Sequence, residues 1–402
     1  MSRVIKKIFI NKNFAFMWAG AIFVSFGFQM YNFSLPIIIY SLTESSLAMS
    51  IMKVANALPI IIIGILSASF IDKYNKKHIM LIVLIIEILL ISITLLFTQY
   101  NSLSIYFLYL LGFLLSFCSY IFSIAKTSIL PYIVKKEELL SANSKSTLTA
   151  TLISIIGPSI AAVSITLLSF RFNFLVFLIS LITLFFFINA ITIDIESKNK
   201  NSKKKFKKMS IIELFSDKNN ITHFTFTMVL LSFSNSLVNG VLTFFALNNL
   251  SVSPFQLGLA YSLSGIGGVL ASLYISKLRL LLTHNKLILI CVILNFIGIF
   301  MIVFTSEWWI LGISIFIRTF GLSMLSIYFI SYRQENVPID MLGKVSSTFN
   351  MITKGVPILG TIIAGVFAEF FNIRLLFGFS SIIILYLMIK NIRYKPTLYD
   401  NG

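Results

Sequence analysis

Long runs of apolar residues alternate with short polar stretches along the whole chain. Each run is long enough to cross the apolar core of a lipid bilayer, which takes about 20 residues of helix. No small-residue cleavage site follows the first run, so we interpret it as an uncleaved anchor helix. The pattern predicts twelve membrane spans, at residues 14–40, 47–71, 78–98, 102–124, 146–168, 172–194, 222–247, 255–276, 287–306, 308–331, 345–368 and 373–391.

The composition supports a membrane protein. Of the 402 residues, 57% are hydrophobic and only 11% are charged, and the mean hydropathy is +0.94. Soluble chains keep about a quarter of their residues charged, so a soluble nuclease, kinase or cytosolic oxidoreductase is excluded. The two cysteines, Cys118 and Cys291, lie in separate apolar spans. They therefore indicate neither a disulfide framework nor a metal cluster.

The excess of positive charge has a topological explanation. The chain holds 32 Lys and Arg against 14 Asp and Glu. With the N-terminus in the cytoplasm, all the basic residues lie on the inner side except Arg171 and Arg374 in outer loops and Lys53, Arg318 and Lys354 within spans. The positive-inside rule then predicts a multi-pass plasma-membrane protein with both termini in the cytoplasm. Nucleic acid is not needed as a partner to explain the charge.

A lysine-rich stretch divides the chain at its midpoint. We expect an N-terminal six-helix bundle at 1–194, a basic cytoplasmic linker at 195–220 and a C-terminal six-helix bundle at 221–402. The linker is either a solvated loop attracted to anionic lipid or a regulatory site. Residues 129–163 and 331–366 share a pattern: a Pro-containing loop, a polar helix start, and a helix broken by Gly and Pro. This similarity indicates an internal duplication.

The short loop between the second and third spans carries a charge motif. In ASFIDKYNKKHIM, the acidic Asp72 is followed by Lys73, Lys76 and Lys77. The motif resembles the loop 2-3 signature of the major facilitator superfamily. A carboxylate at a helix junction can bind basic groups or the positive N-terminal end of a neighbouring helix. The resemblance therefore implies a conformational latch toward helix 11. The alternative is that the lysines only set the topology.

The fifth span contains Gly157 and Pro158 in IIGPSIAAV, which resembles the Gly–Pro motif of antiporter branches of that superfamily. In the family this bend accompanies export, although a simple packing kink is the alternative. WAG in the first span, EELLSAN and RQENVPIDMLGKV extend the resemblance over the full chain, toward the macrolide-efflux and enterobactin-exporter branch. It implies an all-α membrane fold of two pseudo-symmetric six-helix bundles, without cofactor or metal, working as a monomer.

Four ionisable residues lie within predicted spans: Lys53, Glu87, Arg318 and Lys354. Such residues are costly near the bilayer centre and are expected to face a cavity or a partner, although Lys53 is close enough to the surface to snorkel. Desolvation favours the protonated form of a carboxyl group, so Glu87 is our candidate proton carrier; a structural role beside a Lys or a backbone amide is the alternative. Drug/proton antiporters of the superfamily often carry an arginine in helix 4. Here that helix is uncharged and Arg318 lies in helix 10 instead.

Polar stripes mark two further spans. Asn235 and Asn239 lie one turn apart, as do Gln29 and Asn32, so each pair shares a helix face. Each stripe either joins helices or lines a cavity. With helices 1, 4, 7 and 10 lining the central cavity in the family, we predict a substrate cavity formed by Gln29, Asn32, Asn235, Asn239, Arg318 and Lys354.

These features predict secondary active transport, with proton-coupled export of an amphipathic, drug-like or macrolide-like small molecule across the bilayer by alternating access. The alternatives are a dedicated exporter of a siderophore, a self-made antibiotic or a lipid. A polytopic membrane enzyme is disfavoured, because His78, His223 and His284 are scattered among helix ends without a catalytic pattern. A non-transporting sensor is a further alternative, although its usual mark, a soluble signalling domain, is missing. A primary pump is disfavoured by the lack of a Gly-rich phosphate loop.

Overall fold

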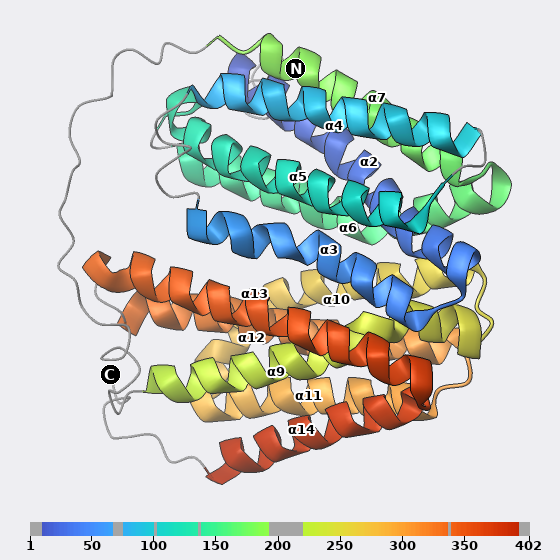
Figure 1. Cartoon of the computed structure of the whole chain (residues 1–402). Coiled ribbons are helices and arrows are strands. Elements are labelled where there is room, and N and C mark those ends of the chain that lie inside the picture. Colours follow the sequence, from blue (N-terminus) through green and yellow to red (C-terminus); the bar gives the residue numbers. More distant parts are fainter. Residues whose placement is uncertain are drawn as a thin grey trace. The chain divides into compact units, whose positions relative to one another are not determined.

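The computed structural model shows a helical protein (Figure 1). Twelve of the described helices are long and apolar enough to cross a membrane. The predicted fold class, an all-α protein with twelve membrane-spanning helices, is confirmed. The residues that the structure describes are 10–66, 75–99, 103–135, 138–192, 220–336 and 339–393.

One compact unit comprises Met1–Thr43 and Met52–Ser202. In it, α2 packs on α6 and α7, and α4 packs on α5 and α7. The contact of α2 with α7 is close at Gly20, where an added Cβ would lie 2.6 Å from Leu184 Cδ1. The helices are α2 (Lys12–Thr43), most of α3 (Ser46–Leu66), α4 (Lys76–Gln99), α5 (Ile105–Ile133), α6 (Leu139–Leu167) and α7 (Phe170–Asn189).

The second unit comprises Glu44–Ile51 and Lys203–Gly402. In it, α12 packs on α10 and α11, α9 packs on α13 and α14, and α11 packs on α14. Its helices are α9 (Asn220–Phe244) with the π-helical turn η3 (Phe245–Asn249), α10 (Pro254–Leu281), α11 (His284–Phe304), α12 (Trp308–Asn336), α13 (Ile339–Phe370) and α14 (Ile373–Arg393). The predicted linker at 195–220 lies outside the described residues except for Asn220, and the predicted domain boundaries stay a prediction.

Large apolar side chains cover the outward faces of the helices. Leu167 is 75% exposed and Leu280 is 88% exposed, although both lie in helices that are apolar along their length. Polar side chains such as Ser34 and Asn173 are instead fully buried and hydrogen-bonded to each other at 2.7 Å. This distribution suits a helix bundle surrounded by hydrocarbon, in which polar groups must find partners inside the protein.

The same local devices recur in the two halves of the sequence. The turn before α3 and the turn before α10 each contain a left-handed residue, Glu44 with φ 47° and Ser251 with φ 51°. Arg171, at the start of α7, donates a hydrogen bond to the carbonyl of Thr98 near the end of α4. Arg374, at the start of α14, donates to the carbonyls of Val303 and Thr305 at the end of α11, at 2.7 and 2.8 Å. These matched devices support an internal duplication.

The two arginines also explain the exceptions to the charge asymmetry. The last carbonyls of a helix lack partners within the helix and carry its partial negative charge. Arg171 and Arg374 satisfy these carbonyls at the ends of α4 and α11. Basic residues at these two positions therefore have a structural role that is independent of membrane topology.

A carboxylate holds the first turn of α3. Glu369, near the end of α13, accepts hydrogen bonds through Oε2 from the hydroxyls of Ser45 and Ser46, each at 3.0 Å, and from the backbone N–H of Leu47 at 3.2 Å. The negative charge and the acceptor both favour a helix N-terminus. The segment Glu44–Ile51 accordingly groups with the second unit, and α3 passes from one unit to the other after Ile51.

Two sequence-based expectations were wrong in detail. The fourth and fifth spans were expected to end at 124 and begin at 146, but α5 continues to Ile133 and α6 begins at Leu139. Hydropathy measures the width of the apolar layer, whereas backbone hydrogen bonds continue the helix into polar residues. The expected helix breaks are also missing, because α6 runs through Pro158 and α13 runs through Pro357. A proline removes one backbone hydrogen bond and need not end a helix.

Candidate functional site

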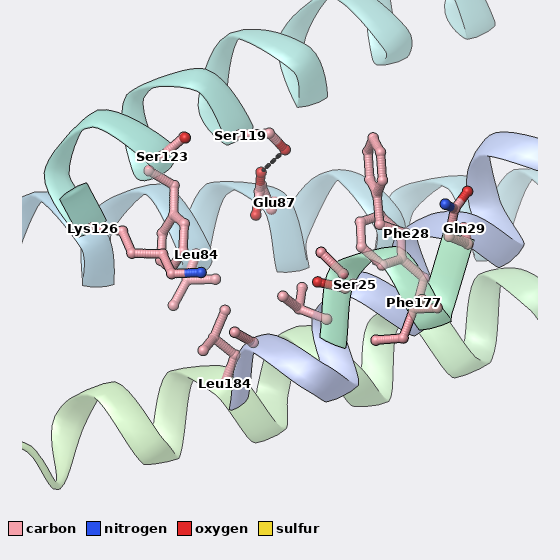
Figure 2. Close-up of a pocket in the computed structure, with 15 residues that line it drawn as sticks. Ser25, Phe28, Gln29, Leu84, Glu87, Ser119, Ser123, Lys126, Phe177 and Leu184 are labelled. Carbon is pink, nitrogen blue, oxygen red and sulfur yellow. Dashed lines mark hydrogen bonds between the residues drawn. The ribbon is translucent and has the colours of Figure 1, made fainter. Parts of the chain in front are cut away.

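The N-terminal unit encloses a cavity of about 410 Å³ (Figure 2). Helices α2, α4, α5, α6 and α7 all contribute to its wall, and Phe28, Phe177 and Leu184 form part of its apolar lining. Ligand pockets in proteins typically have volumes of about 300–1,000 Å³ and combine apolar walls with a few polar groups. The polar residues of this cavity are Ser25, Gln29, Glu87, Ser119, Ser123 and Lys126.

Glu87 provides the carboxylate of the cavity. It is 4% exposed, and its Oε1 accepts a hydrogen bond from the hydroxyl of Ser119 at 2.8 Å (Figure 2). The thiol of Cys118, one residue before Ser119 on α5, interacts electrostatically with the same carboxylate. Glu87 thus lies at a cavity wall with a hydroxyl partner. Its role as a proton carrier stays a prediction, with a structural role as the alternative.

Lys126 provides the cation of the cavity and was missed by the sequence reasoning, which assigned it to a cytoplasmic loop. It lies within α5 and is half-buried. Ser119, Ser123 and Lys126 follow each other at spacings of four and three residues, so they share one face of α5. Lys126 and Glu87 line the same cavity, yet no salt bridge joins these two described residues. The spacing on α5 was the signal in the sequence that could have identified Lys126.

The glycine of the predicted helix 5 motif packs against Gln29, which lines this cavity. Gly157 and Pro158 are buried, and an added Cβ at Gly157 would lie 2.8 Å from the Cβ of Gln29 on α2. Only a residue without a side chain allows this approach of the two helices. In the second unit, an added Cβ at Gly360 would similarly lie 3.1 Å from the carbonyl oxygen of Phe233 on α9.

A second cavity of about 310 Å³ adjoins the first, because Phe28, Ser119 and Ser123 line both. It is also lined by Tyr120 and by Asn32, which belongs to the polar stripe predicted in the first span. The two predicted polar residues of helix 1, Gln29 and Asn32, therefore face adjoining cavities of one unit.

Arg318 organises a polar network in the second unit. Its guanidinium is enclosed, with 4% of the residue exposed, and Nη2 donates to Asn239 Oδ1 at 2.6 Å. The Nε and Nη1 groups have no hydrogen-bond partner among the described residues. Asn235 donates to Asn295 Oδ1 at 2.9 Å, and Asn295 in turn donates to the backbone carbonyl of Arg318 at 3.4 Å. The structure thus brings together three predicted residues and adds Asn295 from α11.

The remaining predicted residues lie elsewhere. Lys354 is exposed on α13. Asp72 and Lys73 lie outside the described residues, so the latch stays a prediction. Lys76 stacks its ammonium 5.9 Å from the ring centroid of Tyr132. Lys77 donates from Nζ to the carbonyls of Asn189 and Ile191, both at 2.7 Å, and so caps the end of α7.

A fold of twelve membrane-crossing helices and a polar cavity within one helix bundle are features of membrane transporters of the major facilitator type. A family model described as a transmembrane secretion effector matches residues 8–400. The chain belongs to this family of membrane transporters. No curated protein matches the sequence.

Solved structures of transporters share the fold. The crystal structure of a bacterial homologue of the iron transporter ferroportin is 14% identical, with a TM-score of 0.76, and the match covers 95% of this chain and 98% of that chain. The nucleoside transporter NupG is 14% identical with a TM-score of 0.72, covering 95% and 100% of the two chains. A bacterial homologue of the human lysosomal transporter Spinster is 10% identical with a TM-score of 0.67, covering 96% and 98%.

Proposed function

We propose that this protein exports an amphipathic small molecule across the plasma membrane and uses the proton gradient to do so. In this proposal both termini are cytoplasmic and the protein works as a monomer by alternating access. Membership of a secretion effector family supports outward transport. The neighbours of similar fold include iron, nucleoside and lysosomal transporters, so the choice of an amphipathic substrate rests on the apolar and polar lining of the cavity.

The position of Glu87 is the observation that carries the proposal. It is the carboxylate in the wall of a cavity large enough for a small molecule, and its Ser119 partner is a hydroxyl that can accompany either protonation state. A proton drives transport only if it binds one conformational state more tightly than another. A carboxyl group that is enclosed in one state and hydrated in another meets this condition. The other titratable groups near it are Lys126 and Cys118, both on α5.

The other predicted residues receive roles that depend on this cycle. Arg318 holds the enclosed network of the second unit and offers two free N–H donors to an anionic group. Gln29 and Asn32 line the cavities of the first unit. The Asp72 latch stabilises one conformational state, and Gly157 keeps α2 and α6 close enough to move together.

Transport into inverted membrane vesicles tests the proposal. The panel contains a lipophilic cation, a macrolide and a siderophore, each with and without an imposed pH gradient. We expect accumulation of at least one compound to depend on the gradient and to disappear with a protonophore. Glu87→Gln should lower gradient-driven accumulation at least about tenfold, which corresponds to about 1.4 kcal/mol of coupling.

The matched control is Glu307→Gln, which neutralises an exposed carboxylate just before α12 and should transport like the wild type. Full gradient-driven accumulation by a well-folded Glu87→Gln protein would remove Glu87 from the mechanism. Accumulation of the siderophore alone would instead favour a dedicated exporter.

A further inference from the structure

The cavity of the N-terminal unit holds two opposite charges that do not neutralise each other by direct contact. Glu87 and Lys126 both line it, and they form no salt bridge. Figure 2 shows the Lys126 side chain extending into the cavity, while the Glu87 carboxylate is hydrogen-bonded to the Ser119 hydroxyl. Charges at a largely apolar wall favour partners of opposite sign, and a ligand can supply them.

The two charges are arranged as separate poles. Ser119, the partner of Glu87, and Lys126 are seven residues apart on α5, so their backbone positions are separated by a rise of about 10 Å along the helix, and the two charges lie beyond salt-bridge distance. Ser123 lies between them on the same cavity wall. The apolar lining from Phe28, Phe177 and Leu184 leaves room for a hydrophobic body. A ligand that matches this wall carries its positive and negative groups several bonds apart.

We propose that the cavity binds an amphipathic zwitterion, with its cationic group at Glu87 and Ser119 and its anionic group at Lys126. This inference rests on the proposed transport function and specifies the substrate class of the same cavity. Neither a simple lipophilic cation nor a simple lipophilic anion pairs with both poles. The Glu87 carboxylate can then hold either a proton or the cationic group of the ligand, so the two compete for one position.

Four fluorescent probes that share the dansyl group separate these possibilities. Nα-dansyl-lysine carries an ammonium and a carboxylate several bonds apart. Nα-dansyl-norleucine lacks the ammonium, dansylcadaverine lacks the carboxylate, and Nε-dansyl-lysine carries both charges on one carbon. Binding is measured by dansyl emission with the purified full-length protein in lipid nanodiscs, with empty nanodiscs subtracted and no pH gradient.

We expect Nα-dansyl-lysine to bind at least about tenfold more tightly than each of the other three probes, as expected for one additional charge-assisted contact. Glu87→Gln should reduce its affinity to that of the norleucine probe and leave the norleucine probe unchanged. Lys126→Met should reduce it to that of dansylcadaverine and leave dansylcadaverine unchanged. Lys126→Arg should retain the preference and serves if Lys126→Met does not fold.

The controls are Glu307→Gln and Lys286→Met, which remove exposed charges in the second unit and should leave all four affinities unchanged. Equal affinity for the four probes would overturn the inference. Equal weakening of all four by both variants would also overturn it, because the two charges would then only maintain the shape of the cavity. If the wild-type protein shows the zwitterion preference but no gradient-driven transport, the proposed function is contradicted and this inference stands.

Discussion

The two units place different groups at one equivalent position. Glu87 and Asn295 occupy the same position counted from the start of α4 and of α11. Glu87 faces a cavity, whereas Asn295 is fully buried and lies in a network with Asn235 and Arg318. The same helix position therefore holds a titratable carboxyl group beside a cavity in the first unit. In the second unit it holds an amide that joins the buried network of Arg318.

The energetic situation of the two charges also differs. Glu87 has a hydroxyl partner and a neighbouring cavity. Arg318 has one side-chain hydrogen bond and two unpartnered N–H groups among the described residues. A buried donor without a partner costs about 1–3 kcal/mol. We therefore expect the network of the second unit to lower stability, as functional sites commonly do.

The equivalence of the two units is tested by adding a side chain at one close helix contact in each unit. Gly157→Leu and Gly360→Leu should each lower the free energy of unfolding by about 3 kcal/mol, because an added side chain has no room against α2 or α9. Gly378→Leu on α14, where an added Cβ meets nothing within 4 Å, is the control and should change it by less than about 0.5 kcal/mol. Thermal unfolding in nanodiscs measures all three. Sensitivity in one unit alone would contradict the equivalence of the two units.

The paired arginines provide a second test. Arg374→Met removes two charge-assisted hydrogen bonds at the end of α11 and should destabilise the protein by about 2 kcal/mol. Arg171→Met should destabilise the protein in the same direction, since its hydrogen bond to the Thr98 carbonyl is lost. Midpoints of thermal unfolding give the comparison. Unchanged midpoints in both variants would show that water replaces the two side chains.

In contrast to Arg171 and Arg374, Arg318 should contribute to substrate affinity and not to stability. Arg318→Met removes two unpartnered buried donors, so the free energy of unfolding should not fall. The apparent affinity for a transported substrate should weaken about fivefold, equivalent to about 1 kcal/mol. Thermal unfolding and the concentration dependence of transport are measured on the same preparation. A clear loss of stability with unchanged affinity would make Arg318 a structural residue and reverse the comparison.

The smallest effect is expected at the cap of α3. Glu369→Gln keeps an acceptor but loses the negative charge near the helix N-terminus, so it should lower stability by about 0.5 kcal/mol. Glu307→Gln again provides the exposed control. In unfolding measurements at increasing salt concentration, the stability difference between Glu369→Gln and the wild type should shrink, because screening weakens the interaction of a charge with the helix.

The sequence predicted the class of fold because apolar length alone identifies a membrane span. It also selected Gln29 and Glu87, since a polar residue in such a span needs a partner. Lys126 was misplaced because helix α5 continues beyond the apolar segment that hydropathy detects. Asn295 was missed because it stands alone in an apolar run. Its importance comes from contacts with α9 and α12, which the spacing along its own helix does not encode.

The cap of α3 has a mechanical consequence. Three of the hydrogen bonds that hold the first turn of this helix end on one atom, Oε2 of Glu369, and the Ser46 hydroxyl also lies 3.2 Å from the carbonyl oxygen of Gly365. A single rotation of the Glu369 side chain would break these three bonds together and leave the Ser46 hydroxyl with the Gly365 carbonyl. The polypeptide passes between the two units at Thr43 and Glu44 and returns at Ile51 and Met52. Because the segment 44–51 groups with the second unit, motion of one unit against the other would flex the chain at the two ends of this segment or release the first turn of α3.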